Sequence, residues 1–158
     1  MDIKKYKELV YQIIGAAMAV HDELKGGLLE GVYQEALSLE LNERGIENRC
    51  EDEISIYYKG HLLEKKYRMD IVVDIVVIEL KSSKNICSVH RSQLCNYLRL
   101  THKPLGILIN FGLSSLQGER WAYDETSNEC VLVDKEMNPV SYKNDPFTDG
   151  TEFIDEKD

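Results

Sequence analysis

Residues 70–81, with the sequence DIVVDIVVIELK, decide the fold of this chain. Residues 75–80 form an almost wholly apolar run, which is typical of a central strand that is buried on both faces. A tight turn at Asp74-Ile75 would join this strand to the one before it as an antiparallel pair. The stretch therefore predicts a buried hairpin at the centre of a sheet.

Three charged side chains accompany this hairpin. In the register of a tight turn, Asp70 lies directly opposite Glu79, and Lys81 shares the face of Glu79 because side chains alternate along a strand. Facing carboxylates need a cation between them, either Lys81 or a divalent metal, and carboxylate oxygens suit Mg²⁺ or Mn²⁺. Charged residues also end many ordinary strands, so spacing alone leaves a simple structural interpretation open. Their place at the end of an apolar run favours a metal site, because buried charges must be paired or metal-bound.

Two helices precede these strands. Apolar residues recur at intervals of three and four between residues 3 and 24, and Gly26-Gly27 ends this helix. A second helix is predicted over about 28–44, with Gly45 as its left-handed C-terminal residue. An alternating pattern from Ile54, a turn at Lys59-Gly60 and a return through residues 62–73 then indicate a hairpin.

The rest of the chain continues the α/β pattern. We expect a helix over 88–102, an apolar strand over 105–109, and weaker strands near 119–123 and 130–133. The order is ααβββαβ, in one domain over residues 1–136. Residues 137–158 are acidic and poor in apolar side chains, and they predict a flexible tail.

Charge is unevenly distributed. The 158 residues carry a net charge of −9, and residues 124–158 contribute most of it. Residues 81–118 contain Lys and Arg but no acid, so a local positive surface is one interpretation and solvated surface cations are the other. With 43% hydrophobic residues, the chain is long enough to form a core without a disulfide or structural metal.

The four cysteines are widely spaced and form no zinc or thioredoxin motif, so we expect reduced, mostly buried thiols. No apolar run approaches the length of a membrane span, and no signal segment follows the N-terminus, which predicts a cytoplasmic protein with no membrane partner.

Several motifs together resemble a known family. The string GLLEGVY at residues 27–33 matches the GxxExxY signature, and YRMD at 67–70, ELK at 79–81 and LINF at 108–111 follow in order. Over about residues 5–123 the chain resembles the GxxExxY protein family, which is placed in the PD-(D/E)xK nuclease-like superfamily. The resemblance implies a restriction-endonuclease-like mixed sheet with an αβββαβ core flanked by helices.

The resemblance also implies roles for single residues. Asp70 and the Glu79-x-Lys81 pair fall on the superfamily pattern, with Glu30 as the helix acid and Met69 in place of the proline. In such enzymes the acids hold Mg²⁺, which polarises the scissile phosphate and activates water, while the lysine orients the water or offsets charge. Glu30 would bind the metal directly or through water.

The helix over 88–102 supplies further candidates, because His90, Gln93 and Tyr97 share one face. By resemblance, Gln93 belongs to the catalytic set, and His90 and Tyr97 are candidates for binding substrate. His90 is as well explained as a surface or capping residue. Tyr33 would either touch the substrate or, as we favour, pack beneath the site, and Trp121 belongs to the core or its rim.

These expectations give two hypotheses. The leading one is a Mg²⁺-dependent (or Mn²⁺-dependent) nuclease that hydrolyses phosphodiester bonds of nucleic acid, with DNA favoured through the superfamily. The alternative is a catalytically silent module of the same fold that uses its acidic tail to bind a partner. A protein partner or a homo-oligomer is left open under either hypothesis.

Overall fold

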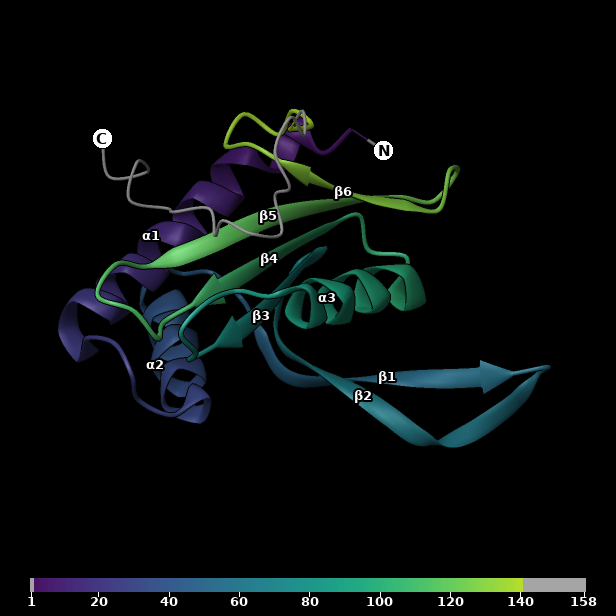
Figure 1. The fold of residues 1–158 in the computed structure, drawn as a ribbon, viewed down its shortest axis with the longest axis horizontal. Helices are drawn as coiled ribbons and strands as arrows, with labels where there is room; N and C mark the ends of the chain where they lie inside the picture. The colour runs from purple at the N-terminus through teal and green to yellow at the C-terminus, as the bar shows by residue number, and fades with distance from the viewer. Residues whose placement is uncertain (1, 141–158) are drawn as a thin grey trace.

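A six-stranded mixed sheet runs through the computed structural model, which describes residues 2–140, and helices lie on both of its faces (Figure 1). The predicted α/β class is confirmed. The helical elements are η1 (Lys4–Tyr6), α1 (Lys7–Leu24), α2 (Glu30–Glu43) and α3 (Ser88–Thr101). The strands are β1 (Arg49–Tyr58), β2 (His61–Val73), β3 (Val76–Lys81), β4 (Leu105–Asn110), β5 (Gln117–Asp124) and β6 (Glu129–Val133).

The strands lie in sequence order, and β3 and β4 form the parallel pair at the centre. The predicted turn between β2 and β3 is present, since Val73 pairs with Val76 and Ile71 with Ile78. Asp74 adopts φ 52° there, a left-handed conformation that Asp tolerates better than most residues. The register deduced from the sequence is therefore correct.

Each face of the sheet has its own apolar layer. One layer packs α1 and α2 on residues that include Ile71, Ile78 and Ile107. The other packs α3, through Leu94 and Leu98, on the opposite face. The almost complete burial of β3 and β4 follows from these two layers, as the apolar run predicts. Trp121 lies in the α3 layer and is buried, so of its two predicted places, the core and its rim, it occupies the core.

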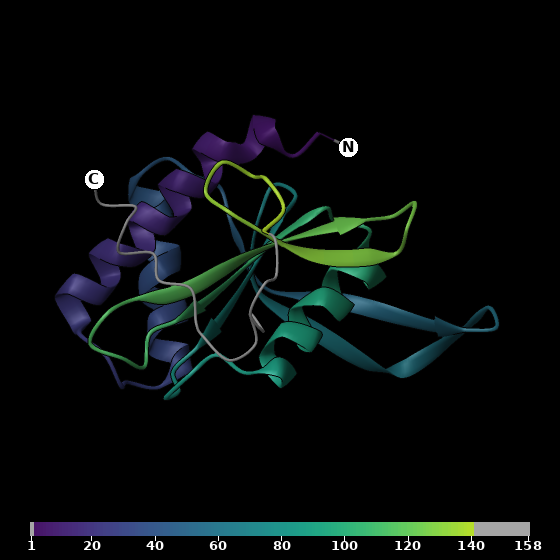
Figure 2. The same cartoon turned by 45° about the horizontal axis from the view of Figure 1, so that its top comes forward.

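The hairpin of β1 and β2 extends away from the body as an arm (Figures 1 and 2). Only the end of β2, from Ile71 to Val73, pairs with β3, whereas β2 pairs with β1 along most of its length. Lys59 and Gly60 both have positive φ angles at the tip, as a two-residue hairpin turn requires. The arm brings exposed side chains of β2 beside α3.

Some boundaries differ from the expectations. The first helix begins with a short 3-10 turn, and β1 begins at Arg49 rather than near Ile54. At the start of the predicted tail, Met137 is buried and Pro139 forms a bridge with Val133, because the chain folds back beside β6. Residues 141–158 of that tail lie outside the described residues.

The cysteine expectation was wrong for this structure. Cys95 of α3 and Cys130 of β6 form a disulfide, and Cys50 and Cys87 are exposed. Two cysteines that are 35 residues apart give no sequence signal of pairing until the sheet places β6 beside the α3 layer. Between residues 2 and 140, no helix is long and apolar enough to cross a membrane.

Candidate catalytic site

Asp70 and Glu79 lie next to the Ile71–Ile78 pair, at the point where β2 and β3 stop pairing. The backbone N–H of Asp70 donates to Glu79 Oε1 at 3.0 Å, and the backbone N–H of Leu80 donates to Asp70 Oδ2 at 2.8 Å. Glu79 is only 2% exposed, and Asp70 is half-buried. Each carboxyl group is therefore held by the opposite strand, and one oxygen of each is not used in these bonds.

Burial makes this pair difficult to ionise. It is the main cause that raises the pKa of Glu79 to about 9, and the charge of Asp70 raises it further. The pKa of Asp70 is also raised, mainly by burial, although the Leu80 N–H and the charge of Lys81 act in the opposite direction. A buried acid pair that resists ionisation in the metal-free protein is a natural site for a cation.

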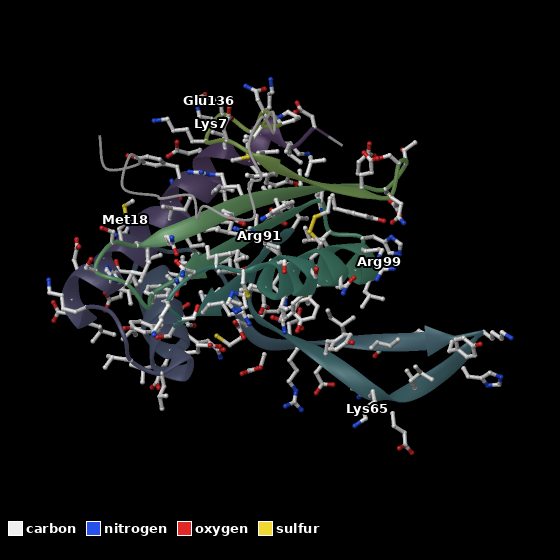
Figure 3. All side chains as sticks on the ribbon, in the orientation of Figure 1. Lys7, Met18, Lys65, Arg91, Arg99 and Glu136 are labelled. Atoms are coloured by element: carbon white, nitrogen blue, oxygen red, sulfur yellow. A yellow bond between two sulfur atoms is a disulfide. The ribbon has the colours of Figure 1, made fainter. Side chains whose placement is uncertain are left out.

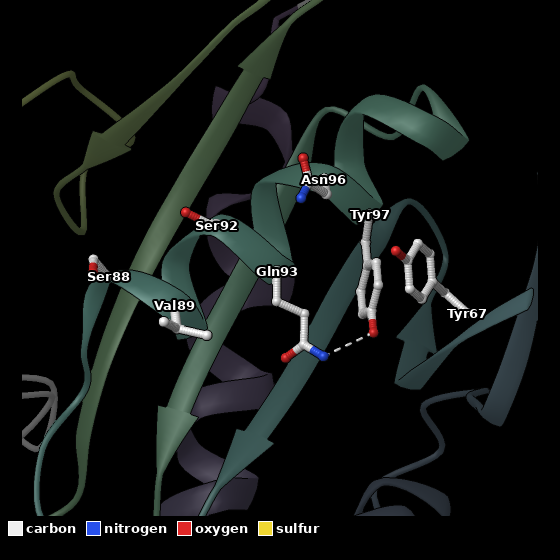
Figure 4. Close-up of a pocket in the computed structure, with 7 residues that line it drawn as sticks. All are labelled: Tyr67, Ser88, Val89, Ser92, Gln93, Asn96 and Tyr97. Carbon is white, nitrogen blue, oxygen red and sulfur yellow. Dashed lines mark hydrogen bonds between the residues drawn. The ribbon is translucent and has the colours of Figure 1, made fainter.

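Lys81 leads from this pair to α3. Its Nζ donates to Gln93 Oε1 at 2.8 Å, and Gln93 Nε2 donates to the Tyr97 hydroxyl at 3.0 Å (Figure 4). Tyr97 is 4% exposed, and its pKa rises to about 12, mainly through burial and then through the charge of Glu79. The chain Lys81–Gln93–Tyr97 thus fixes the ammonium group beside the two acids.

Glu30 and His90 lie at the border of the site. Glu30 is exposed in the first turn of α2, and its charge raises the pKa of Asp70. His90 accepts the Cys87 N–H at 3.3 Å, so it caps α3, and its pKa is lowered by burial and then by Lys81. Among residues 2–140, no three His, Cys, Asp or Glu side chains are grouped as metal ligands. Glu30 therefore does not join Asp70 and Glu79 in a three-carboxylate cluster.

Tyr33 packs beneath the loop that leads into α2. Its side chain is fully buried, and its ring stacks on Phe111 with centroids 4.4 Å apart. The hydroxyl donates to Lys25 O at 2.5 Å and accepts the Leu28 N–H at 3.0 Å. Of the two interpretations of Tyr33, packing is the one that agrees with this geometry. The tyrosine of the GLLEGVY string closes the loop that leads into α2.

A buried amide that sequence analysis did not single out organises the neighbouring loops. Asn110, at the end of β4, accepts the N–H groups of Ser83 and Gly112 at 3.0 Å and donates to Ser83 O. Ser82 also donates to Leu28 O, which ties the α2 entry loop to the segment after β3. The only sequence signal for Asn110 is a polar residue that ends an apolar strand.

Glu51 of β1 is another residue that sequence analysis missed, and it is acidic. The pairs Cys50–Ile71 and Asp52–Met69 flank Glu51 and Asp70, and the charge of Glu51 raises the pKa of Asp70. A bulge between Ser55 and Tyr57 shifts the ladder. In the register of the Lys59-Gly60 turn alone, Arg49 would lie opposite Asp70, so nothing in the sequence pointed to Glu51.

The donor set fits a hard divalent cation. Asp70 and Glu79 offer carboxylate oxygens at one place, and Mg²⁺ typically takes one or two protein carboxylates and completes its shell with water and phosphate. The half-exposure of Asp70 leaves an approach from solvent. No soft ligand is needed, since neither exposed cysteine is grouped with the acids among the described residues.

Comparisons with known proteins identify a family for most of the chain. Residues 7–121, which include every site residue above, match the family described as the PD-(D/E)XK nuclease superfamily. A solved structure titled "Crystal structure of SSO0001" is similar at 24% sequence identity and a TM-score of 0.48. The match covers 61% of this chain and 52% of that one, so this chain spans about half the length of that protein. No curated protein matches the sequence.

Proposed function

The chain belongs to the PD-(D/E)XK nuclease superfamily, and from this membership we propose that it is a metal-dependent nuclease that hydrolyses phosphodiester bonds, with DNA the favoured substrate. The observation that carries the proposal is the buried pair of Asp70 and Glu79 with Lys81 on the same strand as Glu79. A structural ion pair alone would need one acid, not two facing acids, of which Asp70 raises the pKa of Glu79.

Asp70 and Glu79 would hold Mg²⁺ or Mn²⁺, and Glu30 would contribute through water. When bound, the metal supplies Lewis-acid activation of the phosphate and lowers the pKa of a water molecule. Both acids bind a cation best when ionised, so occupancy of the site and ionisation of Glu79 favour each other. The hydrogen bonds from Asp70 N and Leu80 N keep the two carboxyl groups in place before the cation arrives.

Lys81 would act on the reacting phosphate. Its ammonium group lies on the same face as Glu79 and is held by Gln93, so it is positioned to offset the negative charge that develops in the transition state. The Tyr97 hydroxyl holds the other end of the Gln93 amide, which orients the oxygen of that amide toward Lys81. Lys81 is thus the catalytic cation, and Gln93 and Tyr97 are its positioning residues.

The test is cleavage of labelled single-stranded DNA, duplex DNA and RNA by the purified protein in Mg²⁺, Mn²⁺ or chelator. We expect cutting that requires metal and is lost in Glu79→Ala and Lys81→Ala. Lys84→Ala is a matched control, because Lys84 lies exposed in the loop after β3 and makes no part of the proposed site. It should cut as the wild type does.

Each alternative outcome has a distinct meaning. Cutting that survives Glu79→Ala would place the activity elsewhere or in a contaminant. No cutting and no metal binding by a folded protein would overturn the proposal and favour the interaction module. Deletion of residues 141–158 would then test whether a partner is lost with the acidic segment.

A further inference from the structure

A groove of about 390 Å³ separates α3 from the arm (Figure 4). Tyr67 of β2 forms one wall, with its ring centroid 5.6 Å from that of Tyr97. The exposed apolar side chain of Val89 lies at the α3 end. The remaining α3 side chains of the groove are neutral and polar: Ser88, Ser92, Gln93 and Asn96.

The chemistry of the groove differs from that of the acid pair. None of the described side chains that line it is charged. The amides of Gln93 and Asn96 offer both donors and acceptors, and the serine hydroxyls can act as either. Tyr67 is 47% exposed, so its ring is available to a planar ligand. Such a lining suits a flat, polar, uncharged group better than a phosphate.

The groove adjoins the proposed catalytic site through a shared residue. Gln93 lines the groove, and its Oε1 also accepts a hydrogen bond from Lys81 Nζ at 2.8 Å. A ligand seated in the groove is therefore one side chain away from the proposed catalytic cation. A nucleotide whose phosphate lies at Lys81 would extend its sugar and base toward α3 and Tyr67.

We propose that this groove, which we name the α3–β2 groove, binds an unstacked nucleobase next to the scissile phosphate, so that the substrate is a single-stranded segment of nucleic acid. This inference rests on the proposed function. In a duplex, stacking covers the faces of the bases, and the accessible backbone is anionic. An exposed tyrosine and neutral amides match the face and edge of an unpaired base instead.

The strand that carries Tyr67 also carries cations, but Lys66 and Arg68 alternate with Tyr67 and so face away from the groove. Lys65 projects from the arm in Figure 3, and Lys66 and Arg68 lie on the same strand. Glu53 pairs with both Lys66 and Arg68, so part of this charge is already offset. Affinity should therefore be modest in salt and depend on base stacking as well as on charge.

The test measures binding, not cleavage. A DNA oligonucleotide with one 2-aminopurine is titrated with the full chain in Ca²⁺ at low salt, as a single strand and as a duplex. We expect Tyr67→Leu to weaken single-strand binding about fivefold or more and to abolish the quenching of 2-aminopurine. Tyr67→Phe, which keeps the ring, should bind as the wild type does, and duplex binding should change less than about twofold.

A matched control and an independent variant complete the design. Tyr11 on α1 is 48% exposed, so Tyr11→Leu removes an equally exposed ring on the other face of the sheet and should change nothing. Asn96→Ala removes an exposed groove amide and should weaken single-strand binding alone.

The outcomes separate this inference from the proposed function. If the protein cuts in a metal-dependent way and Tyr67→Leu does not change single-strand binding, the proposed role of the groove is wrong and the proposed nuclease activity is supported. Single-strand binding that depends on Tyr67, in a protein that never cuts, would support the groove and overturn the nuclease. Equal losses on single strand and duplex, or no binding of either, would overturn the groove.

Discussion

Asp70 and Glu79 are hydrogen-bonded to each other's strands, since the Asp70 N–H donates to Glu79 Oε1 while Asp70 Oδ2 accepts the N–H that follows Glu79. These two bonds replace regular ladder pairing beyond Ile71–Ile78. The strands therefore separate at the acids, and the two carboxyl groups stay close, with Glu79 buried and Asp70 half-buried. Under the proposed function, this arrangement should make the site dependent on a cation, and the raised pKa of Glu79 should make it sensitive to pH.

Metal affinity should depend on both acids. We expect Asp70→Asn and Glu79→Gln each to lower Mn²⁺ affinity at least about tenfold, because each removes one charged ligand from a two-carboxylate site. Isothermal titration calorimetry measures this directly. Asp74→Asn is the control, since Asp74 is an exposed residue of the β2–β3 turn. Equal affinities of Asp74→Asn and Asp70→Asn would contradict the assignment.

The stability of the metal-free protein should fall as the pH rises. The pKa of Glu79 is about 9 in the fold, against 4.5 as its ordinary value, so above about pH 4.5 the unfolded chain releases a proton that the native state retains. Stability is then lost progressively up to about pH 9. A glutamine at this position has no proton to lose. In chelator, the unfolding midpoint temperature of Glu79→Gln minus that of the wild type should therefore be larger at about pH 8 than at about pH 5. Each kcal/mol of unfolding free energy that the wild type loses corresponds to about 2–4 °C.

The opposite result would be informative. A constant difference between Glu79→Gln and the wild type over this pH range would mean that Glu79 is ionised in the native metal-free protein. Saturating Mg²⁺ should remove most of the pH dependence, because the cation stabilises the ionised carboxylate.

The Lys81–Gln93–Tyr97 chain should affect the cleavage rate but not the metal affinity. We expect Gln93→Leu to lower the cleavage rate about 10- to 100-fold with Mn²⁺ affinity unchanged, because Gln93 contacts Lys81 and not the acids. Tyr97→Phe should have a smaller effect, since it removes only the bond that orients Gln93. Single-turnover kinetics at saturating metal test both. Gln12→Leu on α1 is the control, and a similar loss there would show a general effect on folding.

The centre of the site could be deduced from the sequence because it depends on local geometry. A two-residue turn and side-chain alternation fix Asp70 opposite Glu79 and place Lys81 on the same face, and the structure has this register. The family match covers these residues but does not test their roles. Their assignment as catalytic residues therefore stays a proposal.

The surroundings of the site could not be deduced in the same way. Glu51 comes beside Asp70 only because a bulge shifts the β1–β2 ladder, and no residue type at Ser55–Tyr57 signals it. Tyr67 faces α3 only because the arm runs beside that helix, which is a tertiary relationship (Figure 1). Arg91 belongs to the stretch 81–118, whose cations were expected at the surface, but it is buried against Glu119.

The buried ion pair between α3 and β5 should contribute strongly to stability. Arg91 binds both carboxylate oxygens of Glu119, which also accepts Trp121 Nε1–H, and both charged side chains are nearly inaccessible. Figure 3 shows Arg91 inside the molecule and Arg99 at the surface. We expect Arg91→Met to lower the free energy of unfolding by about 3–5 kcal/mol, because it leaves a buried carboxylate without its cation.

Urea unfolding measures this cost. Arg99→Met is the matched control, since Arg99 is exposed on the same helix and should cost less than about 0.5 kcal/mol. The double variant Arg91→Met with Glu119→Leu should cost less than the sum of the single changes, because neither charge is left alone. Additive costs would mean that the two side chains are not coupled.

Tyr33 should influence the site only through the α2 entry loop. Its hydroxyl joins Lys25 O and the Leu28 N–H, and Leu28 O in turn accepts the Ser82 hydroxyl. Tyr33→Phe keeps the stacking on Phe111 and removes both hydroxyl bonds, at a cost of about 1–2 kcal/mol in unfolding free energy. Because Glu30 begins the helix that this loop leads into, the cleavage rate should fall modestly while substrate affinity stays unchanged. A rise in KM without a change in kcat or stability would instead make Tyr33 a substrate contact, which its complete burial argues against.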